Sequence, residues 1–178
     1  MNPTVAGTTA LATIATQANP GFVARAVWLV DLENAVGDPY APADDIAAVW
    51  QTLVRAISST PDDLMIVGSG SGFAREAWFV LPSRIRRVVR DGKNGGERAL
   101  IEAVDVDQIA CRFGRLVVAS GDHEFVELAM EARVRGMHVH QVTGRGRPAH
   151  SLLNAACSRS RLRLGQPGLR SWRAAIGA

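Results

Sequence analysis

Two acidic side chains follow directly after an apolar segment in the middle of the chain. Residues 115–125 read R-L-V-V-A-S-G-D-H-E-F, so Asp122 and Glu124 come just after the apolar run 116–119. That run is short and β-branched, which is typical of a buried parallel strand. Open α/β sheets bind ligands beyond the carboxyl ends of such strands. Asp122 is therefore a candidate for chemistry, although aspartate is also an ordinary N-cap of a helix.

Carboxylates occupy comparable positions at two other places. The apolar run 26–32 ends in D-L-E-N, which sets Asp31, Glu33 and Asn34 at a strand end, and Glu97 stands at the start of a predicted helix. Buried carboxylates are costly unless something compensates their charge. If these positions converge, their acids repel one another, so a site built from them requires divalent cations.

The donor atoms at these positions are all oxygens. Carboxylate and amide oxygens favour Mg²⁺ or Mn²⁺ over zinc. Such ions polarise a phosphodiester, lower the pKa of an attacking water and stabilise the leaving oxygen. No serine or histidine is paired in a way that indicates nucleophilic catalysis. The residues therefore predict metal-dependent hydrolysis with water as the nucleophile.

Alternating strands and helices are predicted to position these acids. Apolar runs predict strands at 26–32, 64–67, 88–89, 116–119 and 137–142, with an edge strand at 161–164. Apolar residues at helical spacing predict helices at 43–57, 97–112, from 125 onward and 151–157, and a short helix at 73–77. This order predicts an α/β fold with a parallel, helix-covered sheet.

A glycine-rich segment, G-S-G-S-G at 68–72, follows the second predicted strand. It is not followed by Gly-Lys-Ser/Thr, as a P-loop would be, and it does not follow the first strand, as a dinucleotide-binding fingerprint would. The segment is better interpreted as a flexible β–α connection than as a phosphate site.

The composition predicts one domain between two tails. Residues 1–24 carry no charge and are predicted to be a disordered tail, residues 25–165 one domain, and residues 166–178 a C-terminal tail. No stretch resembles a signal peptide or is long and apolar enough to span a membrane. The two cysteines, Cys111 and Cys157, lack metal-ligand spacing and are predicted to be buried free thiols. These features together predict a cytoplasmic protein.

The charge distribution indicates an anionic partner. All 17 acidic residues lie at or before Glu131, whereas residues 132–178 carry nine arginines and no acid. An arginine-rich end would hold a nucleic-acid backbone. The alternative is a compositional bias of the kind that high-GC genomes produce, which also favours arginine over lysine. Candidate phosphate contacts are Lys93, the sole lysine, and Arg145 and Arg147 in G-R-G-R-P at 144–148.

Three motifs in order resemble those of a known family. They are V-D-L-E-N at 30–34, G-K-N-G-G-E at 92–97, and S-G-D-H-E-F at 120–125, which is followed by a helix and by M-H-V-H-Q-V. This series is similar to the NYN domain, a PIN-like domain also called LabA-like, over roughly residues 27–164. The resemblance implies a PIN-like three-layer α/β/α sandwich with a mostly parallel central sheet. It also implies a Mg²⁺- or Mn²⁺-dependent nuclease that acts on RNA.

The resemblance assigns roles to individual residues. Asp31 matches the first metal-binding aspartate, Asn34 its companion amide, and Asp122 the aspartate of the S-G-D motif. The family usually has aspartate where Glu97 and Glu124 stand, and the extra methylene matters because Mg²⁺ demands near-octahedral geometry. We expect metal binding by Asp31, Glu97 and Asp122, and placement of a second ion or the water by Glu124. The expected substrate contacts are Asn34, Lys93, Ser120, Arg145 and Arg147.

Two other functions fit parts of the pattern. A catalytically weak or inactive RNA-binding module would keep the fold and the basic surface, and the two departures from aspartate favour it. Glu102, one turn into its helix, would either replace a ligand or face solvent. A phosphatase or small-molecule hydrolase that uses Asp31 as nucleophile would need Asp-x-Asp, but Glu33 holds the third position. The main prediction is an RNA-cleaving domain, as a monomer or a homodimer.

Overall fold

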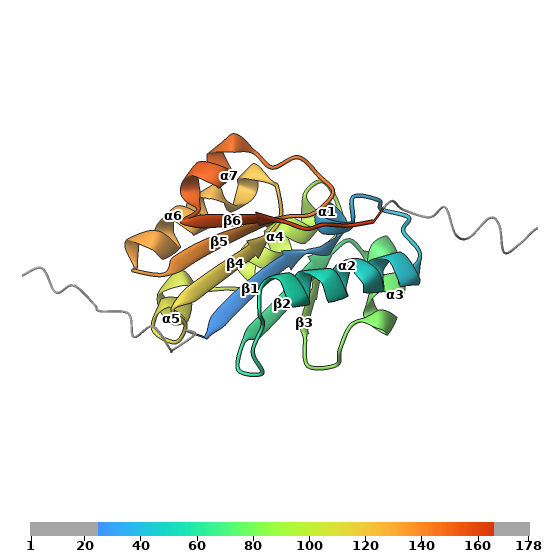
Figure 1. The fold of residues 1–178 in the computed structure, drawn as a ribbon, viewed down its shortest axis with the longest axis horizontal. Coiled ribbons are helices and arrows are strands. Elements are labelled where there is room, and N and C mark those ends of the chain that lie inside the picture. The colour runs from blue at the N-terminus through green and yellow to red at the C-terminus, as the bar shows by residue number, and fades with distance from the viewer. Residues whose placement is uncertain (1–24, 166–178) are drawn as a thin grey trace, which may run out of the picture.

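One parallel sheet forms the centre of the protein. The computed structural model describes residues 25–165, and the tails predicted at 1–24 and 166–178 lie outside these residues. Six parallel strands follow the order β3-β2-β1-β4-β5-β6 (Figure 1). They are β1 (Ala26–Asp31), β2 (Leu64–Ser69), β3 (Arg86–Val89), β4 (Arg115–Ala119), β5 (His138–Thr143) and β6 (Ser158–Arg161). The predicted α/β class is confirmed.

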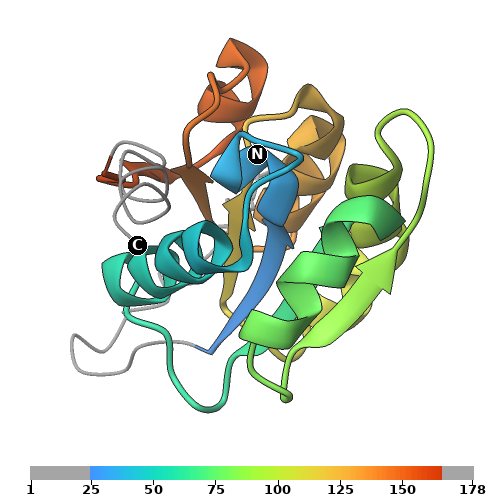
Figure 2. The same ribbon diagram turned by 90° about the vertical axis from the view of Figure 1, so that its right-hand side faces the viewer.

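Helices cover both faces of the sheet, so the domain has three layers (Figure 2). One apolar core lies between the sheet and the helices α2 (Ala43–Ala56) and α3 (Ser71–Val80). The other lies beneath α4 (Gly95–Glu102), α5 (Val106–Ala110), α6 (Val126–Val134) and α7 (His150–Ala155). The predicted α/β/α sandwich is therefore present.

Strand β1 is apolar along its length because it is buried on both faces. Trp28 points into one core and Leu29 into the other, and neither is exposed to solvent. A strand covered on both faces has no solvent side, so its sequence shows an apolar run rather than an alternation.

The order of the strands places a switch point, which we call the crevice, at the carboxyl ends of β1 and β4. The chain moves from β1 to β2 and β3 on one side of β1, then returns to β4, β5 and β6 on the other side. Successive connections therefore diverge at the carboxyl ends of β1 and β4, the place where open α/β sheets bind ligands. Val30 is paired with Ala119, so Asp31 and Ser120 follow these strands at the same level.

Three predicted elements differ in detail from the observed ones. The helix expected at 97–112 is two helices, because Asp105 accepts a hydrogen bond from the Gln108 amide at 3.1 Å and caps the second one. The short helix expected at 73–77 is the longer α3, which makes β2–α3–β3 a regular parallel crossover. The edge strand begins three residues earlier than expected and pairs with β5.

The cysteine prediction is half right. Cys111 and Cys157 are free, as expected, but both are exposed rather than buried. Cys111 follows the last residue of α5, and Cys157 directly precedes β6, so neither lies inside an element that packs on a core.

Among residues 25–165, no helix combines the length and the apolar character that crossing a lipid bilayer requires.

Candidate active site

Asp31 and Asp122 meet at the crevice between β1 and β4. Asp31 is the last residue of β1, and Asp122 lies just after β4, the neighbouring strand. The Ser120 hydroxyl joins them, since it donates to Asp31 Oδ2 at 2.9 Å and accepts from the Asp122 amide at 3.1 Å. Asp31 and Asp122 therefore stand at the ends of two neighbouring strands.

Both aspartates are also N-caps of short helical segments. Asp31 Oδ1 accepts a hydrogen bond from the Asn34 amide at 3.2 Å and caps α1 (Leu32–Val36). Asp122 Oδ1 accepts from the Glu124 amide at 2.9 Å and caps the 3₁₀ turn η1 (His123–Phe125). Asp122 Oδ2 has no hydrogen bond to any residue between 25 and 165. Capping therefore orients each carboxylate and leaves an Asp122 oxygen available to a ligand.

Three glutamates complete what we call the acidic cluster, which consists of Asp31, Glu33, Glu97, Asp122 and Glu124. Partial burial is the largest cause that raises the pKa of Glu97, and the charges of Asp122, Glu33 and Glu124 raise it further. Asp31 is 2% exposed. Its burial, together with the charges of Glu97 and Glu33, raises its pKa to about 7, against hydrogen bonds from Asn34 and Ser120 that lower it.

The chemistry of the acidic cluster fits a hard divalent cation. Every donor is a carboxylate oxygen, the ligand type that Mg²⁺ and Mn²⁺ prefer. A cation would remove the mutual repulsion that raises the pKa values of Asp31 and Glu97.

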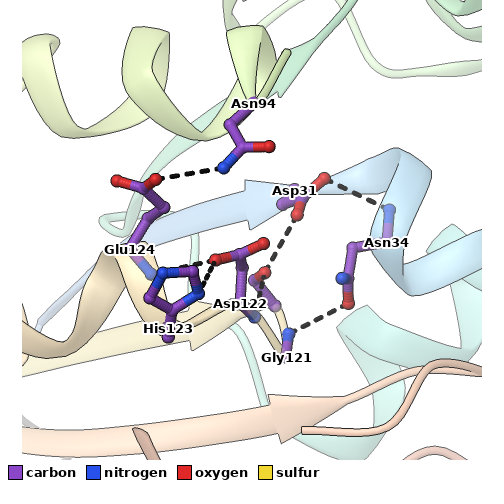
Figure 3. A network of polar contacts seen from close by, with 8 residues as sticks. Asp31, Asn34, Asn94, Gly121, Asp122, His123 and Glu124 are labelled. Atoms are coloured by element: carbon purple, nitrogen blue, oxygen red, sulfur yellow. Dashed lines mark hydrogen bonds and ion pairs between the residues drawn. The ribbon is translucent and has the colours of Figure 1, made fainter. Parts of the chain in front are cut away.

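Two glutamates of the acidic cluster are held by hydrogen bonds to other groups. Glu124 Oε1 accepts from Asn94 Nδ2 at 3.0 Å, and Glu33 Oε1 accepts from the Gly70 amide at 2.5 Å (Figure 3 shows the first). Within the described part of the chain, no three His, Cys, Asp or Glu side chains stand ready to share one ion. A cation common to Asp31, Glu97 and Asp122 remains a prediction.

Two residues predicted to touch substrate instead support the site from within. Ser120 is fully buried and its hydroxyl is bonded to Asp31, so it positions that carboxylate and does not face a substrate. Asn34 Oδ1 accepts from the Gly121 amide at 2.9 Å, which ties α1 to the turn after β4. The side-chain nitrogen Nδ2 of Asn34 forms no hydrogen bond with residues 25–165 and remains free to meet a ligand.

The predicted basic residues border the acidic cluster on two loops. The Arg145 amide donates to the Ala35 carbonyl of α1 at 3.1 Å. A Cβ atom on Gly121 would lie 3.0 Å from the Arg147 carbonyl oxygen, so the arginine loop 144–148 packs directly on the turn after β4. Lys93 is exposed and adjoins Asn94, the partner of Glu124. The backbone of all three residues therefore lies on loops next to the segments that carry the acidic cluster.

Comparisons with known proteins assign no family to this chain. No protein-family model matches it. No curated protein matches it either. A crystal structure of a protein of unknown function from Vibrio parahaemolyticus is similar, with 18% identity and a TM-score of 0.49. The similarity covers 78% of this chain and 92% of that protein.

Sequence reasoning missed a buried amide that supports the turn after β4. Gln141 is fully buried on β5, and its Nε2 donates to the Ser120 carbonyl at 2.7 Å and to Thr143 Oγ1 at 3.0 Å. The signal was present, because a glutamine inside a predicted buried strand must find hydrogen-bond partners. Gln141 thereby fixes the backbone from which Asp122 projects.

Two further sequence hypotheses are settled by neighbouring charges. Glu102 Oε1 lies 2.5 Å from Arg90 Nη1 in an exposed ion pair, so it faces solvent and is no replacement ligand in this conformation. The glycine-rich segment 68–72 includes the β–α connection, but β2 ends at Ser69 and α3 begins at Ser71, so it is shorter than expected. Its amides are already occupied by acids, since Gly70 donates to Glu33 and Ser71 donates to Asp91 at 2.8 Å.

Proposed function

We propose that this protein is a metal-dependent endoribonuclease of the NYN/PIN-like type, which hydrolyses RNA phosphodiesters at the acidic cluster. The observation that carries the proposal is the buried Asp31, whose pKa is raised to about 7 by burial and by neighbouring carboxylates at the crevice between β1 and β4. Strongly perturbed acids in a crevice are typical of functional sites. Purely structural acids are instead placed where partners lower their pKa, as Asp63 is.

Each part of the crevice would have a distinct task. Asp31, Glu97 and Asp122 would hold Mg²⁺ or Mn²⁺. When bound, such an ion polarises the phosphodiester, makes water a better nucleophile and stabilises the leaving oxygen. Glu124, released from Asn94, would accept a hydrogen bond from the attacking water and orient it.

The surrounding loops would bind the RNA. Arg145, Arg147 and Lys93 carry charges on both sides of the acidic cluster and would contact the phosphates next to the scissile one. Arg145 and Arg147 form no side-chain hydrogen bond within residues 25–165, so their guanidinium groups are available for this contact. The side-chain nitrogen Nδ2 of Asn34 would donate to the substrate beside Asp31.

A second candidate is an RNA-binding module without nuclease activity. The hydrogen bond from Asn94 to Glu124 favours it, because that bond holds a carboxylate of the acidic cluster away from a ligand position. This module would bind RNA through the same loops and would not cleave it.

Binding of Mn²⁺ tests the metal site independently of activity. Isothermal titration should give saturable Mn²⁺ binding by the wild-type protein, and a loss of at least tenfold in affinity for Asp31→Asn and for Asp122→Asn. Glu102→Gln is the matched control, since it removes an acid from the same region that is paired with Arg90, and it should bind Mn²⁺ as wild type does.

Cleavage of a labelled single-stranded RNA in Mn²⁺ then separates the two candidates. Wild type and Glu102→Gln should cut it, and the two asparagine variants should not. If the wild-type protein binds RNA but neither binds Mn²⁺ nor cleaves RNA, the nuclease proposal is wrong and the RNA-binding module is correct.

A further inference from the structure

Tyr40 is a large aromatic residue that the fold presents to solvent. It is 91% exposed, on the loop between α1 and α2. The loop is rigid, because Pro39 and Pro42 restrict its backbone. The Tyr40 amide also donates to Asp38 Oδ1 at 2.9 Å, and the Ala41 amide donates to the Asp38 carbonyl at 3.3 Å. The ring therefore projects from a preformed turn.

A cavity of about 540 Å³ lies beside the Tyr40 ring. It is lined by Pro39, Tyr40, Ala41, Pro42, Gly72, Phe73 and Glu76. A Cβ atom on Gly72 would meet nothing within 4 Å, so the wall formed by the first turn of α3 is open. The lining is apolar and aromatic apart from one carboxylate. Such a surface suits a neutral planar ring with amino donors, and the carboxylate disfavours a phosphate inside the cavity.

The cavity lies at the same edge of the sheet as the acidic cluster, because the Tyr40 loop and the start of α3 follow the carboxyl ends of the parallel strands β1 and β2. Helix α1 leads from Asp31 to the Tyr40 loop, and Glu33 on α1 accepts from the Gly70 amide at the start of α3. Arg145 packs against Gly37, at the end of α1 that leads into the Tyr40 loop, since a Cβ atom on Gly37 would be only 2.8 Å from Arg145 Cβ. An RNA strand that runs from the acidic cluster along α1 and past Arg145 would bring a base to Tyr40.

We infer that Tyr40 is a stacking platform for an unpaired nucleobase of the RNA strand bound at the acidic cluster. This inference rests on the proposed function and adds a substrate requirement to it, namely a single-stranded nucleotide next to the cleaved bond. Glu76 on the rim accepts a hydrogen bond from a base amino group, so adenine, cytosine and guanine bind better there than uracil.

The chain offers a direct probe, because Tyr40 is its one tyrosine. Protein labelled with 3-fluorotyrosine gives a single ¹⁹F resonance from residue 40. The Asp122→Asn protein, which should not cleave, is titrated with a single-stranded RNA and with the same RNA carrying one abasic site. RNA binding is followed in parallel by fluorescence anisotropy. Stacking should shift the resonance with the intact RNA and leave it unshifted with the RNA whose abasic site falls at Tyr40.

Substitutions give a second readout. Tyr40→Ala should weaken binding about tenfold, and Tyr40→Trp should restore it, because base stacking tolerates any aromatic ring. Phe79→Ala is the matched control, since Phe79 is equally exposed at 91% but lies in the last turn of α3. For the wild-type protein, the abasic site should weaken RNA binding by the same factor as Tyr40→Ala does. For the Tyr40→Ala protein, the abasic site should not weaken binding further, because both changes remove the same stacking interaction.

The outcomes separate this inference from the proposed function. RNA binding with an unshifted resonance, or with unchanged affinity for Tyr40→Ala, would overturn the stacking platform and leave the nuclease intact. A shifted resonance with no Mn²⁺-dependent cleavage by wild type would support stacking and overturn the nuclease. Absence of RNA binding would overturn both.

Discussion

The Ser120 hydroxyl donates a hydrogen bond to Asp31 Oδ2 at 2.9 Å, although the two residues are 89 positions apart. The bond crosses from β4 to β1, which are adjacent in the sheet. It lowers the pKa of Asp31, but burial and the charges of Glu97 and Glu33 raise that pKa more, to about 7. In the absence of a cation, Asp31 therefore keeps its proton up to about pH 7.

Asp31→Asn should stabilise the metal-free protein at pH 8 by on the order of 4 kcal/mol. The unfolded Asp31 ionises near 3.8, whereas the folded one keeps its proton up to about 7. Wild-type stability should therefore fall as pH rises from about 4 to about 7 and level off above, and the variant should lack this decline. Urea unfolding in EDTA at several pH values measures it.

Asp63, at the opposite edge of the sheet, is a control because its pKa is shifted in the direction opposite to that of Asp31. Burial raises its pKa, but hydrogen bonds from Thr60, Ala26 and Trp28 outweigh burial and lower the pKa overall. The stabilisation that ionised Asp63 gives to the fold is therefore present above the pKa of the unfolded state and is lost as the pH falls. Asp63→Asn should destabilise the protein by about 1–2 kcal/mol at pH 7. Equal changes in the free energy of unfolding for Asp31→Asn and Asp63→Asn would contradict this explanation of Asp31.

Gln141→Leu should destabilise the protein by about 1–3 kcal/mol, because it leaves the buried Ser120 carbonyl and the Thr143 hydroxyl without their partner. Since the turn that carries Asp122 then loses its support, Mn²⁺ affinity should fall as well. Gln51→Leu, on the exposed side of α2, should change stability by less than about 0.5 kcal/mol. Unchanged Mn²⁺ affinity in Gln141→Leu would show that the turn after β4 keeps its conformation without Gln141.

Asp122→Asn should abolish Mn²⁺-dependent cleavage and keep or improve RNA binding. Asparagine is as good an N-cap as aspartate, so η1 should persist while one negative ligand is removed. Less negative charge also repels phosphate less. Gel assays of cleavage and anisotropy measure the two effects. Parallel loss of RNA binding would mean that Asp122 acts mainly through structure.

Glu97→Asp and Glu124→Asp test how the site has adapted to longer side chains. If the extra methylene impairs metal geometry, the double variant should cleave faster than wild type. Glu124→Asp should in addition break the hydrogen bond from Asn94, because the shorter carboxylate no longer reaches it. Slower cleavage by the double variant would indicate a site fitted to glutamate. Single-turnover cleavage rates at saturating Mn²⁺ distinguish an impaired site from one that is fitted to glutamate.

Arg145→Ala with Arg147→Ala should weaken RNA binding and flatten its dependence on salt. The log–log slope should fall by about 0.7 for each phosphate that is no longer neutralised. Arg133→Ala with Arg135→Ala changes the net charge equally. Those arginines contact the protein itself, Arg133 at the Asn154 and Ala155 carbonyls and Arg135 at Asp107. The control slope should stay at the wild-type value, and identical slopes for both double variants would mean that total charge alone matters.

Local sequence determined the elements and the ends at which the acids stand. Apolar runs without alternation indicated strands buried on both faces, and Asp31 and Asp122 follow two of them. Strands in a parallel sheet all end at one edge, so placement of both acids at that edge needed no knowledge of strand order. Their adjacency did need it, because only the pairing of β1 with β4 makes them neighbours.

Tertiary structure decided what each polar side chain contacts. Ser120 looked like a substrate contact and instead bonds within the fold, to Asp31, while Asn34 uses its Oδ1 to hold the Gly121 amide. Glu102 turned out to pair with Arg90. These partners come from segments distant in sequence, and a side chain's direction depends on which of them packs nearby. Residue type and spacing determine which groups can donate or accept, and only packing determines which ones meet.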